Sequence, residues 1–90
     1  MRLDMFLKVS RLIKRRTVAK DSCDGGKIKV GGSSAKAARE VKPGDMIDLK
    51  IGKRRVVVEV LEIPKGNVAK ELAANLYRVV EETKIEEDLY

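Results

Sequence analysis

The stretch KRRTVAKDSCDGGKIKVGG, Lys14 to Gly32, changes its residue pattern halfway along. Its first half places small residues on one helical stripe, at Val18, Ala19, Ser22 and Cys23. The glycine pair at 25 and 26 ends that pattern. The run that follows, Lys-Ile-Lys-Val, alternates polar and apolar residues, as a half-exposed strand does. The stretch therefore predicts a helix that turns at two glycines directly into a strand.

Three cations stand at the start of this helix, where the positive end of the helix dipole disfavours them. Thr17 is the expected N-cap, which would place Lys14, Arg15 and Arg16 just before the helix. Free N–H groups at a helix start bind phosphate well. Two arginines beside such groups therefore indicate a site for a phosphate.

The flanking sequence predicts the other elements of the fold. Apolar residues at helical spacing indicate a first helix over 2–9. Pro and Gly at the centre of 42–45 indicate a type II turn. Strands are expected over 46–51 and 54–63, joined as a hairpin. Asn67 is a plausible N-cap for a last helix that runs to position 80.

These elements predict an α+β fold, in which two N-terminal helices pack on a small, mostly antiparallel sheet, plus a C-terminal helix. Ninety residues suffice for one domain. We expect the domain to cover 1–63, with a core motif over 1–49. The C-terminal helix, over 64–80, is expected to pack on the domain. The acidic tail, over 81–90, is expected to fray.

The net charge of +6 is unevenly distributed along the chain. Residues 1–60 carry 16 Lys and Arg against 7 Asp and Glu, whereas residues 61–90 carry 4 against 7. Between Leu7 and Ala19 there are five cations and no acid. A patch of one sign repels itself unless a partner neutralises it, so a polyanion is the expected partner, either nucleic acid or an anionic membrane surface.

The composition argues against several functions. The chain has no histidine, which excludes Ser–His and Cys–His catalysis and a Cys/His zinc finger, and we expect no metal or cofactor. The single cysteine, Cys23, is interpreted as a small buried hydrophobic residue. Three aromatic residues are too few to bind single strands by stacking. No apolar run approaches the ~20 residues that span a bilayer, and we see no secretion signal.

The ordered pattern over about 1–49 resembles the S4 RNA-binding domain, which occurs in ribosomal protein S4, several pseudouridine synthases and some tyrosyl-tRNA synthetases. The matching positions are Arg2-Leu3-Asp4-x-Phe6-Leu7, Arg11, Lys14-Arg15-Arg16, Ala19, Gly26-Lys27-Ile28-Lys29-Val30, Gly32, Lys36, Val41 and Gly44-Asp45. The family often has Asn-Gly where this chain has Gly31-Gly32. Glycine also accepts a positive φ, so the turn is expected to survive.

The whole chain, with its Arg-Arg-Val-Val-Val strand and Asn67–Ala73 after it, resembles the RqcP (YabO) family, which is similar to the S4-type ribosome-binding heat-shock protein. The resemblance implies an RNA-binding factor of ribosome-associated quality control in the cytoplasm. Its implied partners are large-subunit rRNA and peptidyl-tRNA on obstructed subunits, and an RqcH-type factor that adds C-terminal alanine tails. We expect no membrane partner, and a monomer off the ribosome.

We expect RNA to contact the two helices and the strand after them. The candidate residues are Arg2, Asp4, Lys8, Arg11, Lys14, Arg15, Arg16, Lys27 and Lys36. Arginine pairs with phosphate oxygens through its planar fork. Asp4, beside Arg2 and Arg11, is expected to orient an arginine, and under the resemblance it could also meet a base or a ribose hydroxyl.

Three other functions remain open from the sequence. The first is a general structured-RNA binder that acts in ribosome assembly or with an RNA-modifying enzyme. The second is a shortened pseudouridine synthase, which is disfavoured because little chain follows the S4-like region. The third is a membrane-surface module, which is disfavoured because the second helix offers only small residues opposite its cations. We therefore expect no enzymatic activity.

Overall fold

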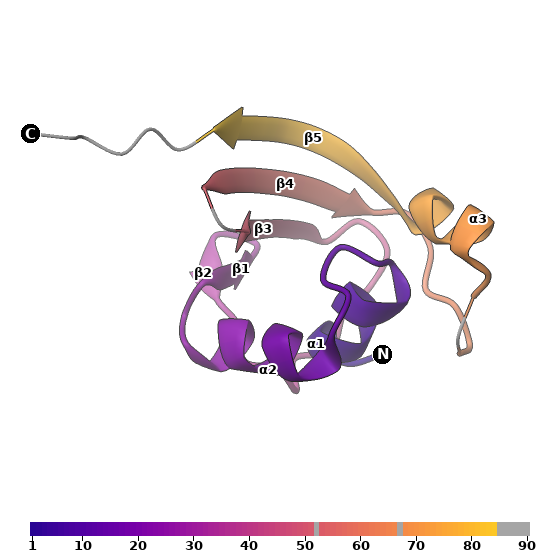
Figure 1. Ribbon diagram of the computed structural model, residues 1–90, viewed down its shortest axis with the longest axis horizontal. Helices are drawn as coiled ribbons and strands as arrows, with labels where there is room; N and C mark the ends of the chain where they lie inside the picture. The colour runs from indigo at the N-terminus through magenta and orange to yellow at the C-terminus, as the bar shows by residue number, and fades with distance from the viewer. Residues whose placement is uncertain (52, 67, 85–90) are drawn as a thin grey trace, which may run out of the picture.

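The computed structural model describes residues 1–51, 53–66 and 68–84. Its elements are α1 (Leu3–Val9), α2 (Arg16–Asp24), β1 (Ile28–Val30), β2 (Ser33–Ser34), β3 (Met46–Ile51), β4 (Arg54–Val60), α3 (Lys70–Ala73), the 3-10 helix η1 (Ala74–Leu76) and β5 (Tyr77–Lys84). The strands form one antiparallel sheet in the order β2-β1-β3-β4-β5. Figure 1 shows α1 and α2 on one side of this sheet. The α+β fold with two N-terminal helices on an antiparallel sheet is confirmed.

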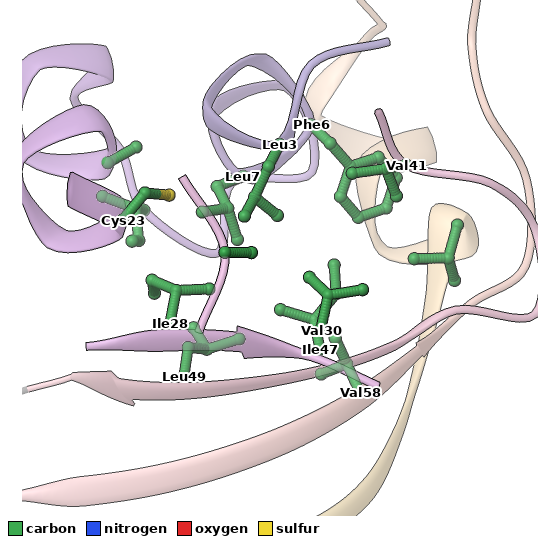
Figure 2. Close-up of a cluster of buried hydrophobic side chains, with 14 of the residues drawn as sticks. Leu3, Phe6, Leu7, Cys23, Ile28, Val30, Val41, Ile47, Leu49 and Val58 are labelled. Carbon is green, nitrogen blue, oxygen red and sulfur yellow. The ribbon is translucent and has the colours of Figure 1, made fainter. Parts of the chain in front are cut away.

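The core lies between the two helices and the facing side of the sheet. Leu3, Phe6 and Leu7 of α1 are fully buried, which confirms the apolar stripe read from their spacing. The stripe faces Ile28 of β1 and Leu49 of β3, as Figure 2 shows. Alternate residues of each strand therefore point at the helices, and the residues between them point to the opposite face.

Cys23 and Ala19 form the buried side of α2. Their small side chains allow α2 to lie close to α1 and β1 (Figure 2). Val18, in contrast, is 47% exposed, so the buried stripe of this helix is narrower than the sequence suggested. Close packing of α2 fixes where its exposed cations stand relative to α1.

Two turns have the backbone that their sequences predict. Gly44 has φ of +93°, and the Asp45 N–H donates to the Lys42 carbonyl at 3.1 Å, as in a type II turn. Gly31 and Gly32, between β1 and β2, have φ of +61° and +87°. A positive φ is a conformation that side chains with a Cβ rarely adopt, so glycine suits both turns.

The helix expected over 64–80 is wrong for most of that range. Only Lys70–Ala73 is α-helical, Ala74–Leu76 is a 3-10 turn, and Tyr77–Lys84 is strand β5. The residues Tyr-Arg-Val-Val favour a strand, and β4 offers them an unpaired edge. Pairing with β4 satisfies the backbone groups of both strands along seven residue pairs.

The tail expected to fray over 81–90 is wrong for its first four residues, which belong to β5. Positions 85–90, and the N-cap expected at Asn67, lie outside the described residues. The expected strand over 54–63 is shorter and ends at Val60, because the next two N–H groups donate to the Leu76 carbonyl. The division of the chain into 1–63, 64–80 and 81–90 stays a prediction.

Candidate RNA-binding surface

A buried carboxylate lies at the corner where α1 meets α2. The side chain of Asp4 is 2% exposed, and its Oδ1 accepts the Met5 N–H at 2.8 Å. Arg2 donates from Nε to Oδ1 at 3.2 Å and from Nη2 to Oδ2 at 3.4 Å. Arg16 Nε lies 3.5 Å from Oδ2. Asp4 therefore holds two arginines, one from before α1 and one from the start of α2.

Both of these arginines keep their other donors toward solvent. Their side chains are each 47% exposed, and a hollow of about 310 Å³ lies over them, lined by Arg2, Asp4, Arg16, Thr17 and Lys20. Asp4 fixes the side chains by one edge, so the remaining N–H groups can bind a phosphate oxygen with little loss of rotamer freedom. The expected Asp4–Arg2 contact is present, whereas the second arginine is Arg16 and not Arg11.

Arg11 stands in the turn between the two helices with φ of +62°. The turn is held by Ser10, whose buried hydroxyl donates to the Leu7 carbonyl at 3.2 Å, and by the Ile13 N–H, which donates to the same carbonyl at 3.1 Å. A left-handed backbone costs a residue with a Cβ roughly 1–2 kcal/mol. Such strain at an exposed arginine is typical of positions kept for function.

Two further hollows flank this turn and gather the other candidate cations. The first, about 210 Å³, is lined by Lys8, Val9, Arg11, Lys14 and Val68. The second, about 570 Å³, is lined by Arg11, Leu12, Ile13, Lys14, Arg15, Val18, Ser22, Lys27 and Lys50. The fold thus brings Lys27, which precedes β1, beside cations of the helix pair. Among the described residues, carboxylates line neither hollow.

The N-terminus of α2 opens onto the same surface. Helix α2 begins at Arg16 and Arg15 is its extended N-cap residue, so the expected cap at Thr17 is wrong. The N-cap makes no side-chain hydrogen bond, and the first turn holds no acid. Its first N–H groups remain available to an anion that also meets Arg15.

Lys36 stands apart from the other candidates. Its Nζ donates to the Asp24 carbonyl at 3.3 Å, while the Asp24 carboxylate accepts the Ala37 N–H at 3.1 Å. Lys36 therefore binds the C-terminal end of α2, where the helix dipole favours a cation. Its geometry fits a structural role better than a place on the RNA surface.

Sequence reasoning missed Lys20 and Lys50. Lys20 follows Arg16 by four residues on α2, and that spacing could have found it. Lys50 is brought to the second hollow by the pairing of β3 with β1, for which the local sequence gives no signal.

The thiol of Cys23 does not add chemistry to this surface. Burial, with a smaller contribution from the charge of Asp4, raises the pKa of Cys23 to about 11, so the thiolate is scarce at neutral pH. The described residues contain no group of three or more His, Cys, Asp or Glu that could hold a metal ion. In the same part of the chain, no helix is long and apolar enough to cross a membrane.

A cationic helix pair packed on an antiparallel sheet is the organisation of S4-domain proteins, and the S4 domain family model matches residues 1–47. Curated relatives match almost the full chain. The RQC P-site tRNA stabilizing factor of Bacillus subtilis is 52% identical over 97% of this chain and 100% of its own length. The protein of the same name from Streptococcus pneumoniae is 47% identical over 99% of this chain and 100% of its length. The chain belongs to the family of RQC P-site tRNA stabilizing factors.

A solved structure agrees with this assignment. Trimeric Heat Shock Protein 15 of Vibrio cholerae superposes with a TM-score of 0.83 at 30% identity, over 89% of this chain and 81% of that one. The resemblance read from the sequence, to a stand-alone S4 protein similar to the heat-shock protein, is confirmed. The comparisons assign no individual RNA-binding residue, so the list of contact residues stays a prediction.

Proposed function

We propose that this protein binds P-site peptidyl-tRNA and rRNA on large ribosomal subunits obstructed by an unfinished chain, in ribosome-associated quality control. It holds the tRNA in place while an RqcH-type factor extends the nascent chain with alanine. The name of its relatives supports the P-site tRNA as target. The role is one of binding in the cytoplasm and needs no bond-making chemistry.

The observation that carries this proposal is the cationic surface around the α1–α2 turn. Lys8, Arg11, Lys14 and Arg15 are exposed there, and no ion pair engages their side chains within the described part of the chain. Unpaired cations of one sign, grouped around a helix N-terminus, favour phosphate groups as the ligand. Few aromatic side chains are available, so the RNA is recognised by its backbone and shape.

Arginine and lysine have different tasks in this mechanism. Arg2 and Arg16, held by Asp4, present oriented forks that suit one phosphate position. The lysines are flexible point charges that follow the RNA backbone and add salt-dependent affinity. Together they fix the orientation of the domain against the two RNAs.

The proposal is tested by sedimentation with large subunits that carry peptidyl-tRNA, over a series of monovalent salt concentrations at constant magnesium. We compare wild type with the double variant Arg11→Ala/Arg15→Ala. The matched control is Lys42→Ala/Lys70→Ala, which removes the same charge from exposed positions outside the three hollows described above. Loss of two phosphate contacts lowers the slope of log K against log salt by roughly 1.4–1.8. Equal binding of both variants would contradict the proposal.

A further inference from the structure

The face of the sheet turned away from the helices carries a second group of cations. Ile28, Val30 and Leu49 point at the helices, so the residues between them point outward. In the register of the sheet, Lys29 of β1 lies opposite Asp48 of β3, and Lys50 of β3 lies opposite Arg55 of β4. These four side chains therefore share the outer face on three adjacent strands.

Arg55 is the most strongly held of them. Its Nε donates to both oxygens of Asp48, at 3.0 and 3.1 Å, and its Nη2 donates to Oδ2 at 2.6 Å. These hydrogen bonds, and the charge of Asp48, raise the pKa of Arg55. The side chain is still 39% exposed. One edge of the guanidinium is thus fixed and the other faces solvent, as at Asp4.

The remaining cations of this face have no anionic partner. Lys29 and Lys50 are exposed, and no hydrogen bond or ion pair engages their side chains over 1–51, 53–66 and 68–84. A hollow of about 280 Å³ lies between them, lined by Gly26, Lys27, Lys29, Asp48, Lys50 and Arg55. Four cations against one carboxylate leave a surplus of three positive charges around it.

The surplus is confined to one end of the outer face. Toward β5 the same face carries Glu59, paired with Arg78 at 2.5 Å, and Glu81, opposite Val57. Positive and negative charges balance there. The cationic end instead adjoins the helix surface, because Lys27 and Lys50 line both this hollow and the one beside the α1–α2 turn.

We propose that Lys29, Lys50 and Arg55 form a second phosphate-binding surface, which extends the RNA contact from the helix pair onto the outer face of the sheet. The ligand is the RNA backbone, a second segment of the RNA bound by the helices or a second RNA. Asp48 positions Arg55 for it. This inference rests on the proposed RNA-binding function and enlarges the contact beyond the helix pair.

Two alternatives fit the same residues less well. Lysines on strands often block edge-to-edge association, but β1 and β3 both have neighbours on either side. A protein partner would be expected to use aromatic or apolar anchors, and protein interfaces are poor in lysine. The hollow is lined by one glycine and five charged residues. A polyanion is the ligand that suits such a surface.

The test uses the double variant Lys29→Ala/Arg55→Ala and the matched control Arg78→Ala/Lys84→Ala, in which the same charge is removed from β5. Each pair contains one arginine that is bound to one carboxylate. Affinity is measured for large subunits that carry peptidyl-tRNA, again over a salt series. Loss of two phosphate contacts lowers the salt slope by roughly 1.4–1.8, which at 0.1 M salt is about 25- to 60-fold in affinity.

The outcomes separate this inference from the function on which it rests. A large loss in Lys29→Ala/Arg55→Ala, with the β5 control near wild type, supports the second surface. If both variants bind like wild type while Arg11→Ala/Arg15→Ala binds weakly, the second surface is refuted and the RNA-binding function stands. If wild type itself fails to bind, the proposed function has failed. Thermal unfolding of each variant shows whether a loss comes from misfolding.

Discussion

Replacement of Asp4 by asparagine separates positioning from net charge. The variant raises the net charge of the protein from +6 by one unit. If the cationic surface worked through total charge alone, Asp4→Asn would bind RNA more tightly. The geometry predicts the opposite, because Arg2 and Arg16 lose the carboxylate that fixes their side chains.

The cost in stability follows from the contacts of Asp4. Asparagine keeps an oxygen that can accept the Met5 N–H, so the bonds lost are those to the two arginines. Hydrogen bonds to charged groups contribute about 1.5–3 kcal/mol when buried. Both arginines are 47% exposed and regain water, so pairs of this kind contribute nearer the surface value. We expect the free energy of unfolding to fall by about 1–2 kcal/mol in all.

Urea denaturation measures the stability of this variant, and sedimentation with subunits that carry peptidyl-tRNA measures its affinity. Glu59→Gln is the control, since it makes the same charge change at the exposed pair with Arg78. We expect it to cost less than about 1 kcal/mol and to bind like wild type or slightly better. Unchanged or tighter binding of folded Asp4→Asn would refute the positioning role of Asp4.

Three further predictions concern single positions. Alkylation of Cys23 at pH 8 should be about a hundredfold slower in the native protein than in urea, because its pKa is about 11 instead of the ordinary 9.0; equal rates would contradict its burial. Gly31→Ala should lower the free energy of unfolding by about 1 kcal/mol and Gly31→Asn by less, since φ is +61° there and asparagine tolerates it better; the reverse order in urea melts would be inconsistent with that turn. Arg11→Gly should be at least as stable as Arg11→Ala, because glycine relieves the left-handed backbone, while both bind RNA more weakly than wild type; a clearly less stable glycine variant would argue against the strain.

The sequence predicted the first half of the fold well because its signals there are local. The apolar spacing of Leu3, Phe6 and Leu7 indicates one helix face, and Gly25 and Gly26 mark where helical spacing becomes strand alternation. Such features depend on neighbours within a few residues, which is the range that sequence patterns report.

The last third could not be predicted in the same way. Val68, Leu72 and Leu76 follow at helical spacing, yet Leu72 is 54% exposed and Leu76 is buried. What decides the structure of 77–84 is the open edge of β4, some twenty residues away, which captures the segment as a strand. Tertiary pairing of this kind overrides a short helical pattern.

The candidate site divides along the same line. The grouping of Arg11, Lys14 and Arg15 was visible as an acid-free run of sequence. The pairing of Asp4 with Arg16, and of Asp48 with Arg55, depends on how helices and strands dock. Those docking contacts convert scattered charges into oriented ones, and only the structure reveals them.

The central claim is that this domain recognises a subunit occupied by peptidyl-tRNA. The most direct measurement compares co-sedimentation of the wild-type protein with empty large subunits and with subunits that carry peptidyl-tRNA, at the same salt and magnesium concentrations. The account predicts clearly tighter binding to the occupied subunit, with that preference lost in Arg16→Ala. Equal binding to both, or to free structured RNA, would contradict the claim and leave a general RNA-binding domain.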